Sequence, residues 1–77
     1  MLTSEQLRAA RAMVRVDQKT LATAAGISIP TLKRLEAGSG PLATSHQTAE
    51  RLKAALESVC VEFIADEAGI GVRLKMP

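Results

Sequence analysis

The stretch that most constrains the fold covers residues 18–36 and has the pattern of two short helices joined by a tight turn. In its first half, Leu21, Ala22 and Ala25 fall on one stripe of a helix. Gly26 follows directly, and a glycine after the last periodic residue is typical of a left-handed helix end, because glycine has no Cβ to clash there. We therefore expect the first helix to end at Gly26. Ala22 is small where a second helix has to cross closely.

The second half of the stretch predicts another helix after an N-cap at Ser28, whose hydroxyl can accept a hydrogen bond from a first-turn amide. Leu32 and Leu35 are expected to point inward from it. Pro30 is tolerated in the first turn, although it disfavours the helical conformation for Ile29, so a helix start at Pro30 is the alternative. The small alanine, the turn glycine and the inward leucines together predict a helix-turn-helix.

Residues 3–60 resemble the Xre/Cro-like phage-repressor family of helix-turn-helix DNA-binding domains. The resemblance is carried by residue types at matching spacing, namely Gln18, Leu21-Ala22, Gly26-Ile27-Ser28, Leu32 and Leu35-Glu36-x-Gly38. It implies a mainly α fold with a compact four-helix repressor-like helix-turn-helix domain in residues 1–60. It also implies sequence-specific binding of double-stranded DNA, usually by a bacterial or phage transcriptional regulator that acts as a dimer. Repression is the commoner outcome in the family, and activation stays open.

The resemblance also implies which side chains meet DNA, because the first turn of the second helix enters the major groove in this family. We expect base edges to be contacted by Ile29, Pro30, Lys33 and Arg34. Ile29 offers apolar contact suited to a thymine methyl, whereas Lys33 and Arg34 can donate to guanine O6 and N7. Phosphate contacts are expected from Arg11, Arg15, Gln18, Lys19, Thr31 and Ser39. The residues expected to hold the motif together are Ala22, Gly26, Leu32, Leu35 and Glu36.

Arg11 and Glu36 stand where the family pairs an arginine of the first helix with a glutamate at the end of the recognition helix. Two interpretations are open: the pair fixes the recognition helix and directs Arg11 to a phosphate, or it is an ion pair that only stabilises the fold. Many family members carry a polar residue at the position of Ile29, sometimes bonded to the residue matching Gln18. Without that partner, Gln18 is expected to be freer to bind a phosphate, or to be a surface residue beside a cap.

The N-terminal residues predict a helix that begins at about Ser4 and ends near Val14. Thr3 and Gln6 have the spacing of a capping box. Arg15 follows where the resembled family often has a left-handed glycine. Either Arg15 accepts the cost of a positive φ, or this turn is built differently. The next helix is expected to be capped by Asp17.

A fourth helix is predicted from a second possible capping box, Thr44 and Gln47, to about Val59. Its inward stripe is expected to be Ala49, Leu52, Leu56 and Val59. Cys60 comes next and is expected to be a small, half-buried hydrophobe, since a redox switch has no supporting partner in the chain. The loop before this helix carries no basic residue after Ser39, so few phosphate contacts are expected on that side.

The last part of the chain changes to a period of two, which predicts a β-hairpin in residues 61–77. Val61 and Phe63 are expected on one face and Val72 and Leu74 on another, with a turn between the strands. An isolated hairpin is marginal in water and needs a surface to lie on or a second hairpin to pair with. Val61, Phe63, Val72 and Leu74 are therefore predicted to make a homodimer contact, with or without the fourth helix.

Composition limits the functions that remain. The formal net charge is +2, and residues 1–40 hold six basic and three acidic residues, whereas residues 41–77 hold four basic and five acidic ones. The positive half therefore contains the helix-turn-helix, as expected if phosphates approach there. A single aromatic residue, Phe63, leaves little to stack on a base, which argues against single-strand or RNA recognition. No apolar run is long enough for a membrane span, and a lone cysteine suits a reducing cytoplasm.

Two functions are consistent with these patterns. The first is a homodimeric transcriptional regulator on a near-palindromic operator, cytoplasmic and associated with the nucleoid. The second is an antitoxin or accessory module that binds a partner protein through its C-terminal strands, with DNA binding secondary or lost. An enzyme is not expected, because the chain has one His, one Cys, no phosphate-binding glycine loop and no paired carboxylates outside a turn. The same inventory predicts no metal site and no cofactor.

Overall fold

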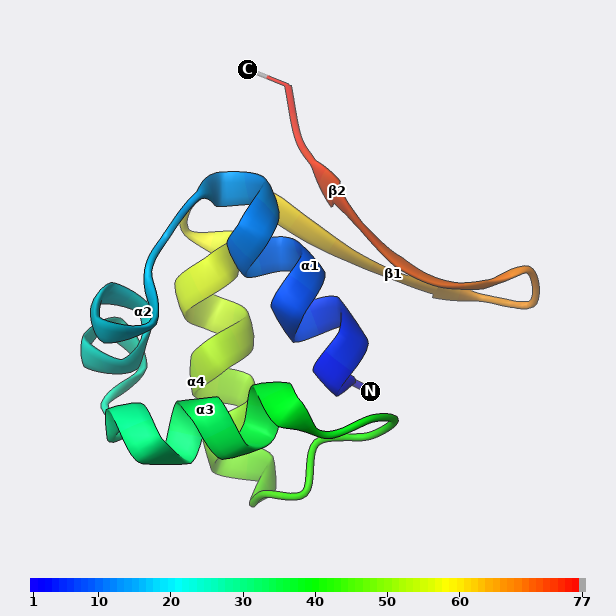
Figure 1. Ribbon diagram of the computed structural model, residues 1–77. Helices are drawn as coiled ribbons and strands as arrows, with labels where there is room; N and C mark the ends of the chain where they lie inside the picture. The colour runs from blue at the N-terminus through cyan, green and yellow to red at the C-terminus, as the bar shows by residue number, and fades with distance from the viewer. Residues whose placement is uncertain (77) are drawn as a thin grey trace.

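A computed structural model describes residues 1–76 and contains four helices followed by a two-stranded antiparallel sheet (Figure 1). The elements are α1 (Ser4–Val14), α2 (Gln18–Ala25), α3 (Ile29–Ala37), α4 (His46–Glu57), β1 (Val61–Asp66) and β2 (Gly69–Leu74). The mainly helical composition and the C-terminal hairpin agree with the sequence-based prediction. Within the described residues, no helix has both the length and the apolar character needed to cross a membrane.

The boundaries of α1 confirm the predicted capping box and resolve the question raised by Arg15. The Thr3 hydroxyl accepts a hydrogen bond from the Gln6 amide, and the Gln6 side chain accepts one from the Thr3 amide, both at 3.1 Å. Arg15 closes the helix in the left-handed region, with φ 57° and ψ 35°. The turn therefore keeps the left-handed geometry that glycine adopts easily, and Arg15 carries the conformational cost.

The segment that contains α2, the following turn and α3 also has the predicted boundaries. Gly26 ends α2 with φ 71°, and the amide of Ile27 donates to the carbonyl of Ala22 at 3.0 Å. Ser28 caps α3 by accepting a hydrogen bond from the amide of Thr31 at 3.2 Å. Helix α3 therefore begins before Pro30, and the proline lies in the first turn, where amides lack partners within the helix.

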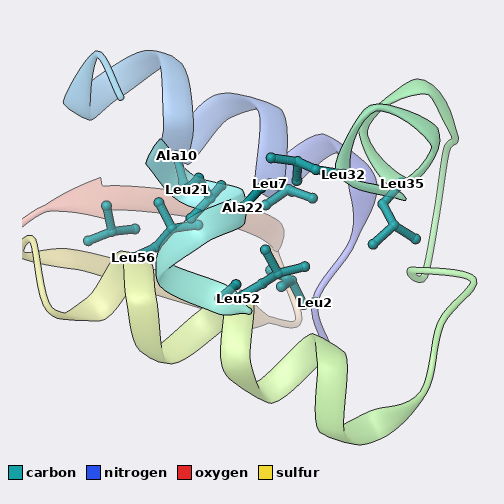
Figure 2. Packing of buried hydrophobic residues seen from close by; sticks show 11 residues of the cluster. Leu2, Leu7, Ala10, Leu21, Ala22, Leu32, Leu35, Leu52 and Leu56 are labelled. Carbon is teal, nitrogen blue, oxygen red and sulfur yellow. The ribbon is translucent and has the colours of Figure 1, made fainter. Parts of the chain in front are cut away.

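One hydrophobic core joins all four helices to the hairpin (Figure 2). Ala22 on α2 and Leu32 on α3 are almost completely buried, which agrees with the structural role expected of them. The small side chain of Ala22 lets the helices approach closely. The buried apolar residues are Leu2, Leu7, Ala10, Leu21, Ala22, Ala25, Leu32, Leu35, Leu52, Leu56 and Val61.

The fourth helix differs from the prediction at both ends. Its cap is Ser45, whose hydroxyl accepts a hydrogen bond from the amide of Thr48 at 3.1 Å, so the predicted box at Thr44 was one residue early. The helix stops at Glu57, and Val59, expected on the inward stripe, is 42% exposed. The predicted periodicity was extended too far because the chain leaves the helix through a tight turn before it enters β1.

Cys60 lies in this turn, directly before β1. Its φ is 73°, so it takes the left-handed conformation at the place where a glycine would be natural. Its thiol is free and the residue is exposed, which makes the prediction of a half-buried hydrophobe wrong. The left-handed backbone places the Cys60 carbonyl against the amide of Lys75, at 2.8 Å, and so extends the strand pairing by one bond.

The hairpin register corrects the predicted division of its apolar residues between two faces. Val61 lies opposite Leu74, and Phe63 lies opposite Val72. Residues directly opposite each other in a sheet share a face, so all four side chains lie on the same face. Val61 is 1% exposed, and Phe63 and Val72 pack partly against the core, whereas Leu74 is 43% exposed. The hairpin therefore lies on the helices of its own chain, and its tip projects beyond them (Figure 1).

Two groups of hydrogen bonds attach later segments to the start of α1. The Gln6 side-chain amide donates to the carbonyls of Ile64 and Gly71, one on each strand of the hairpin. The loop after α3 is held by bonds from the Ser4 amide to the Gly40 carbonyl and from the Gly40 amide to the Glu5 carboxylate, both at 2.9 Å. The first turn of α1 therefore positions both the hairpin and the loop after α3.

Candidate nucleic-acid interface

Helix α3 presents a cationic, solvent-exposed side. Pro30, Lys33 and Arg34 are exposed, whereas Leu32 and Leu35 of the same helix are buried in the core. Ile29, predicted to contact bases, is partly buried and packs against the core, so only part of its side chain is available for an apolar contact. Two cations and a proline on an exposed helix side suit a groove in double-stranded DNA, where lysine and arginine can donate to base edges or phosphates.

Arg11, Gln18 and Glu36 form one hydrogen-bonded cluster that links α1, α2 and α3. The Arg11 Nε and Nη2 atoms donate to the two carboxylate oxygens of Glu36, at 2.6 and 3.0 Å. The Gln18 Nε2 atom donates to Glu36 Oε1 at 2.9 Å. Glu36 is 5% exposed, so this carboxylate replaces its water contacts with protein donors.

The cluster also defines what remains free on Arg11 and Gln18. Arg11 Nη1 donates to the carbonyl of Val16 at 3.1 Å, so three N–H groups of the guanidinium are used inside the fold. Donation of hydrogen bonds to the Glu36 carboxylate raises the pKa of Arg11 above its ordinary value. Gln18, expected to be freer for a phosphate, is instead bonded to Glu36, which leaves its second Nε2 N–H and its side-chain oxygen for outside partners. Both residues therefore act first as structural links between helices.

The other residues predicted to contact phosphates lie in two places. Arg15, at the end of α1, and Lys19, in the first turn of α2, are exposed and add positive charge there. Asp17 lies between them and caps α2, accepting a hydrogen bond from the Thr20 amide at 2.7 Å, and this bond lowers the pKa of Asp17. Ser39 is exposed in the loop after α3.

Thr31 is partly buried in the first turn of α3, and both its amide and its hydroxyl oxygen form hydrogen bonds with Ser28. Its hydroxyl oxygen accepts a hydrogen bond from the Ser28 hydroxyl at 2.8 Å, while its amide donates to the same Ser28 hydroxyl, which caps the helix. The Thr31 hydroxyl can still donate its own proton to a phosphate. Arg34, on the following turn, has one long contact, from Nη1 to the Ala43 carbonyl at 3.4 Å, and otherwise faces solvent.

Two residues that the sequence patterns did not single out hold the C-terminal end of α3. The Ser4 hydroxyl donates to the Leu35 carbonyl at 2.7 Å. Arg8 Nη1 donates to the carbonyls of Glu36 and Gly38. The signal available in the sequence was their spacing, since Ser4, Arg8 and Arg11 recur at intervals of four and three residues and so share one face of α1.

The residues predicted to make a dimer contact lie on the hairpin, away from this cationic surface. Val61 is enclosed by its own chain, so it is not available to a second copy. Leu74 and Ile70 are exposed, the latter by 52%, and they provide the apolar surface of the hairpin that remains open.

No protein-family model matches the sequence, and a search of curated proteins finds no match.

Proposed function

We propose that this protein is a sequence-specific, double-stranded DNA-binding transcriptional regulator that inserts α3 into the major groove. The observation that carries the proposal is the combination of a buried network and an exposed cationic face on one short helix. Glu36 ties the end of α3 to α1 and α2, while Lys33 and Arg34 are exposed on its solvent side. A helix held in this way can present base-reading side chains in a fixed register.

Arg15 and Lys19 support the proposal from the neighbouring connection. Phosphate contacts fix the orientation of a protein on the duplex, and base contacts supply the sequence preference. In the proposed complex, Arg15, Lys19 and the Ser39 hydroxyl contact phosphates, whereas Pro30, Lys33, Arg34 and the exposed part of Ile29 meet base edges. Arg11 contributes a phosphate contact only through the N–H groups that Glu36 and Val16 leave free.

The proposed active form is a homodimer on a near-palindromic operator. A single small module buries about 600–1,000 Å² on DNA, so a second copy on a half-site about 34 Å away supplies the additional affinity. The exposed part of the hairpin, including Ile70 and Leu74, is the proposed contact between copies. Occupation of an operator in this way represses transcription by excluding the polymerase, and the proposed location is the cytoplasmic nucleoid.

The test is selection of operators from a randomised double-stranded DNA library by the purified full-length chain at physiological salt. The proposal expects an enriched inverted repeat whose half-sites are about one helical turn apart. Uniform binding that depends steeply on salt, without enrichment, would show an electrostatic affinity with no sequence preference and would refute the proposal.

The hairpin supports a second candidate, a module that binds a different protein. Within residues 1–76 the sheet contains only β1 and β2, so each strand has one edge that no other strand pairs with, and Ile70 and Leu74 are exposed. Removing the whole hairpin is a poor test because it also removes Val61 from the core. The double variant Ile70→Asp/Leu74→Asp leaves Val61 in the core. Loss of self-association in this variant supports the homodimer. If the protein is a monomer with or without the substitutions and the variant loses a heteromeric complex, the partner-binding module is supported.

A further inference from the structure

Helix α3 ends without the usual left-handed cap. Its C-cap residue, Gly38, has φ −79° and ψ −170°, which is extended backbone, whereas Arg15 and Gly26 close α1 and α2 in the left-handed region. A left-handed cap normally supplies backbone N–H groups to the last carbonyls of a helix. The carbonyls at the end of α3 therefore need donors from elsewhere in the molecule.

Helix α1 supplies those donors through side chains. The Ser4 hydroxyl donates to the Leu35 carbonyl at 2.7 Å, and Arg8 Nη1 donates to the carbonyls of Glu36 and Gly38. The two helices are close at this point, because a Cβ added to Gly38 would lie 3.2 Å from the Ser4 oxygen. The positive guanidinium of Arg8 also suits the negative end of the α3 dipole.

We infer that Arg8 is a positioning residue for DNA recognition, which fixes the C-terminal end of α3 and the start of the following loop against α1. This inference rests on the proposed DNA binding. Arg11 holds the Glu36 side chain, and Arg8 holds the Glu36 main chain one turn earlier on α1. Together they fix both the rotation of α3 and the direction in which the chain leaves it. Arg8 therefore acts through α3 and not through a phosphate of its own.

The salt dependence of DNA binding distinguishes an arginine that positions α3 from an arginine that contacts a phosphate. Each phosphate contact contributes about −0.9 to the slope of log affinity against log salt concentration. We expect Arg8→Ala to bind the selected operator about tenfold more weakly, with the slope of the parent protein. A slope that becomes shallower by about 0.9 would identify Arg8 as a phosphate contact and overturn the inference, as would an unchanged operator affinity.

Two further variants complete the design. Arg8→Lys keeps the charge but not the planar guanidinium, so we expect the operator affinity to stay below that of the parent while affinity for random DNA is unchanged. Full recovery of operator binding by Arg8→Lys would contradict the inference. Arg51→Ala removes the same charge from an exposed position on α4 and serves as the matched control, for which parental operator affinity is expected.

Amide hydrogen exchange without DNA tests the structural half of the inference separately. In Arg8→Ala, exchange should become faster in residues 36–40 and remain at the parental rate in α2, whereas Arg51→Ala should leave both unchanged. If no operator can be selected for the parent protein, the proposed function fails, and this measurement still reports on whether Arg8 orders the end of α3. Unchanged exchange in residues 36–40 would refute that ordering.

Discussion

The buried carboxylate of Glu36 accepts two hydrogen bonds from the guanidinium of Arg11, at 2.6 and 3.0 Å, across the contact between α3 and α1. Gln18 adds a third donor from α2. Three helices that are separated in sequence thus meet at one side chain. Because Glu36 is 5% exposed, a change at this position affects both the stability of the fold and the orientation of α3.

The first prediction concerns the Arg11–Glu36 pair. Arg11→Ala leaves a buried carboxylate with Gln18 as its remaining side-chain donor, and removing one partner of a buried pair costs about 3 kcal/mol or more. Urea unfolding of the variant should show a loss of this order in the free energy of unfolding. The double variant Arg11→Met/Glu36→Leu removes both charges and should recover part of the loss. If the double variant were less stable than Arg11→Ala, the unpaired charge of Glu36 would not be the cause of the loss in Arg11→Ala.

The second prediction concerns the exposed cations of α3. Arg34→Ala and Lys33→Ala should each weaken operator binding and leave the fold intact, since substitutions at exposed positions usually change stability by about 0.5 kcal/mol or less. If either side chain reads a guanine, its loss should relax the preference at one base pair by about 1–3 kcal/mol. Affinities for the selected operator and its single-base variants, with circular dichroism as the folding check, measure both effects. Lys75→Ala on the exposed end of the chain is the matched control. Parental affinity in both α3 variants would show that α3 does not read the operator.

The third prediction concerns Leu32, which has 0% exposure at the centre of the core. Leu32→Ala removes a buried side chain of α3 and should cost about 2–5 kcal/mol of stability. Val59→Ala, at a position that is 42% exposed, is the matched control and should change the melting temperature little. Comparable losses in the two variants would contradict the assignment of Leu32 to the core.

Most features set by neighbouring residues were predicted correctly, although the equally local cap of α4 was placed at Thr44, one residue before Ser45. The capping box at Thr3 and Gln6, the left-handed Gly26 and the cap at Ser28 each depend on residues within one turn of each other, and all were correct. The end of α4 was placed too late because apolar periodicity continues through Val59, although the backbone already turns there.

The features that were missed depend on contacts between distant segments. Arg8 and Ser4 donate hydrogen bonds to carbonyls 28 to 31 residues away. Every residue has a main-chain carbonyl, so the residue types in the sequence do not indicate which carbonyl accepts. The four apolar residues of the hairpin share a face because of the strand register, which the two-residue turn sets. Alternation within each strand does not reveal this register. Gln18 was predicted to be free because Ile29 cannot bond to it, but Glu36 provided another partner.

The last prediction concerns pH. Hydrogen bonds from backbone amides lower the pKa of Asp17 at the start of α2 and of Glu5 beside Gly40. A carboxyl group whose pKa is lower in the folded state stabilises the fold above its unfolded value, about 4, and this contribution disappears as pH falls through the folded value. Thermal melting should therefore show that Asp17→Asn lowers the midpoint at pH 7 and that the difference from the parent shrinks toward about pH 2. Glu67→Gln, at the hairpin tip, removes a carboxylate that caps no helix and is the matched control. A deficit of Asp17→Asn that stays constant down to about pH 2 would mean that geometry, and not the charge of Asp17 at the α2 N-terminus, provides the stabilisation.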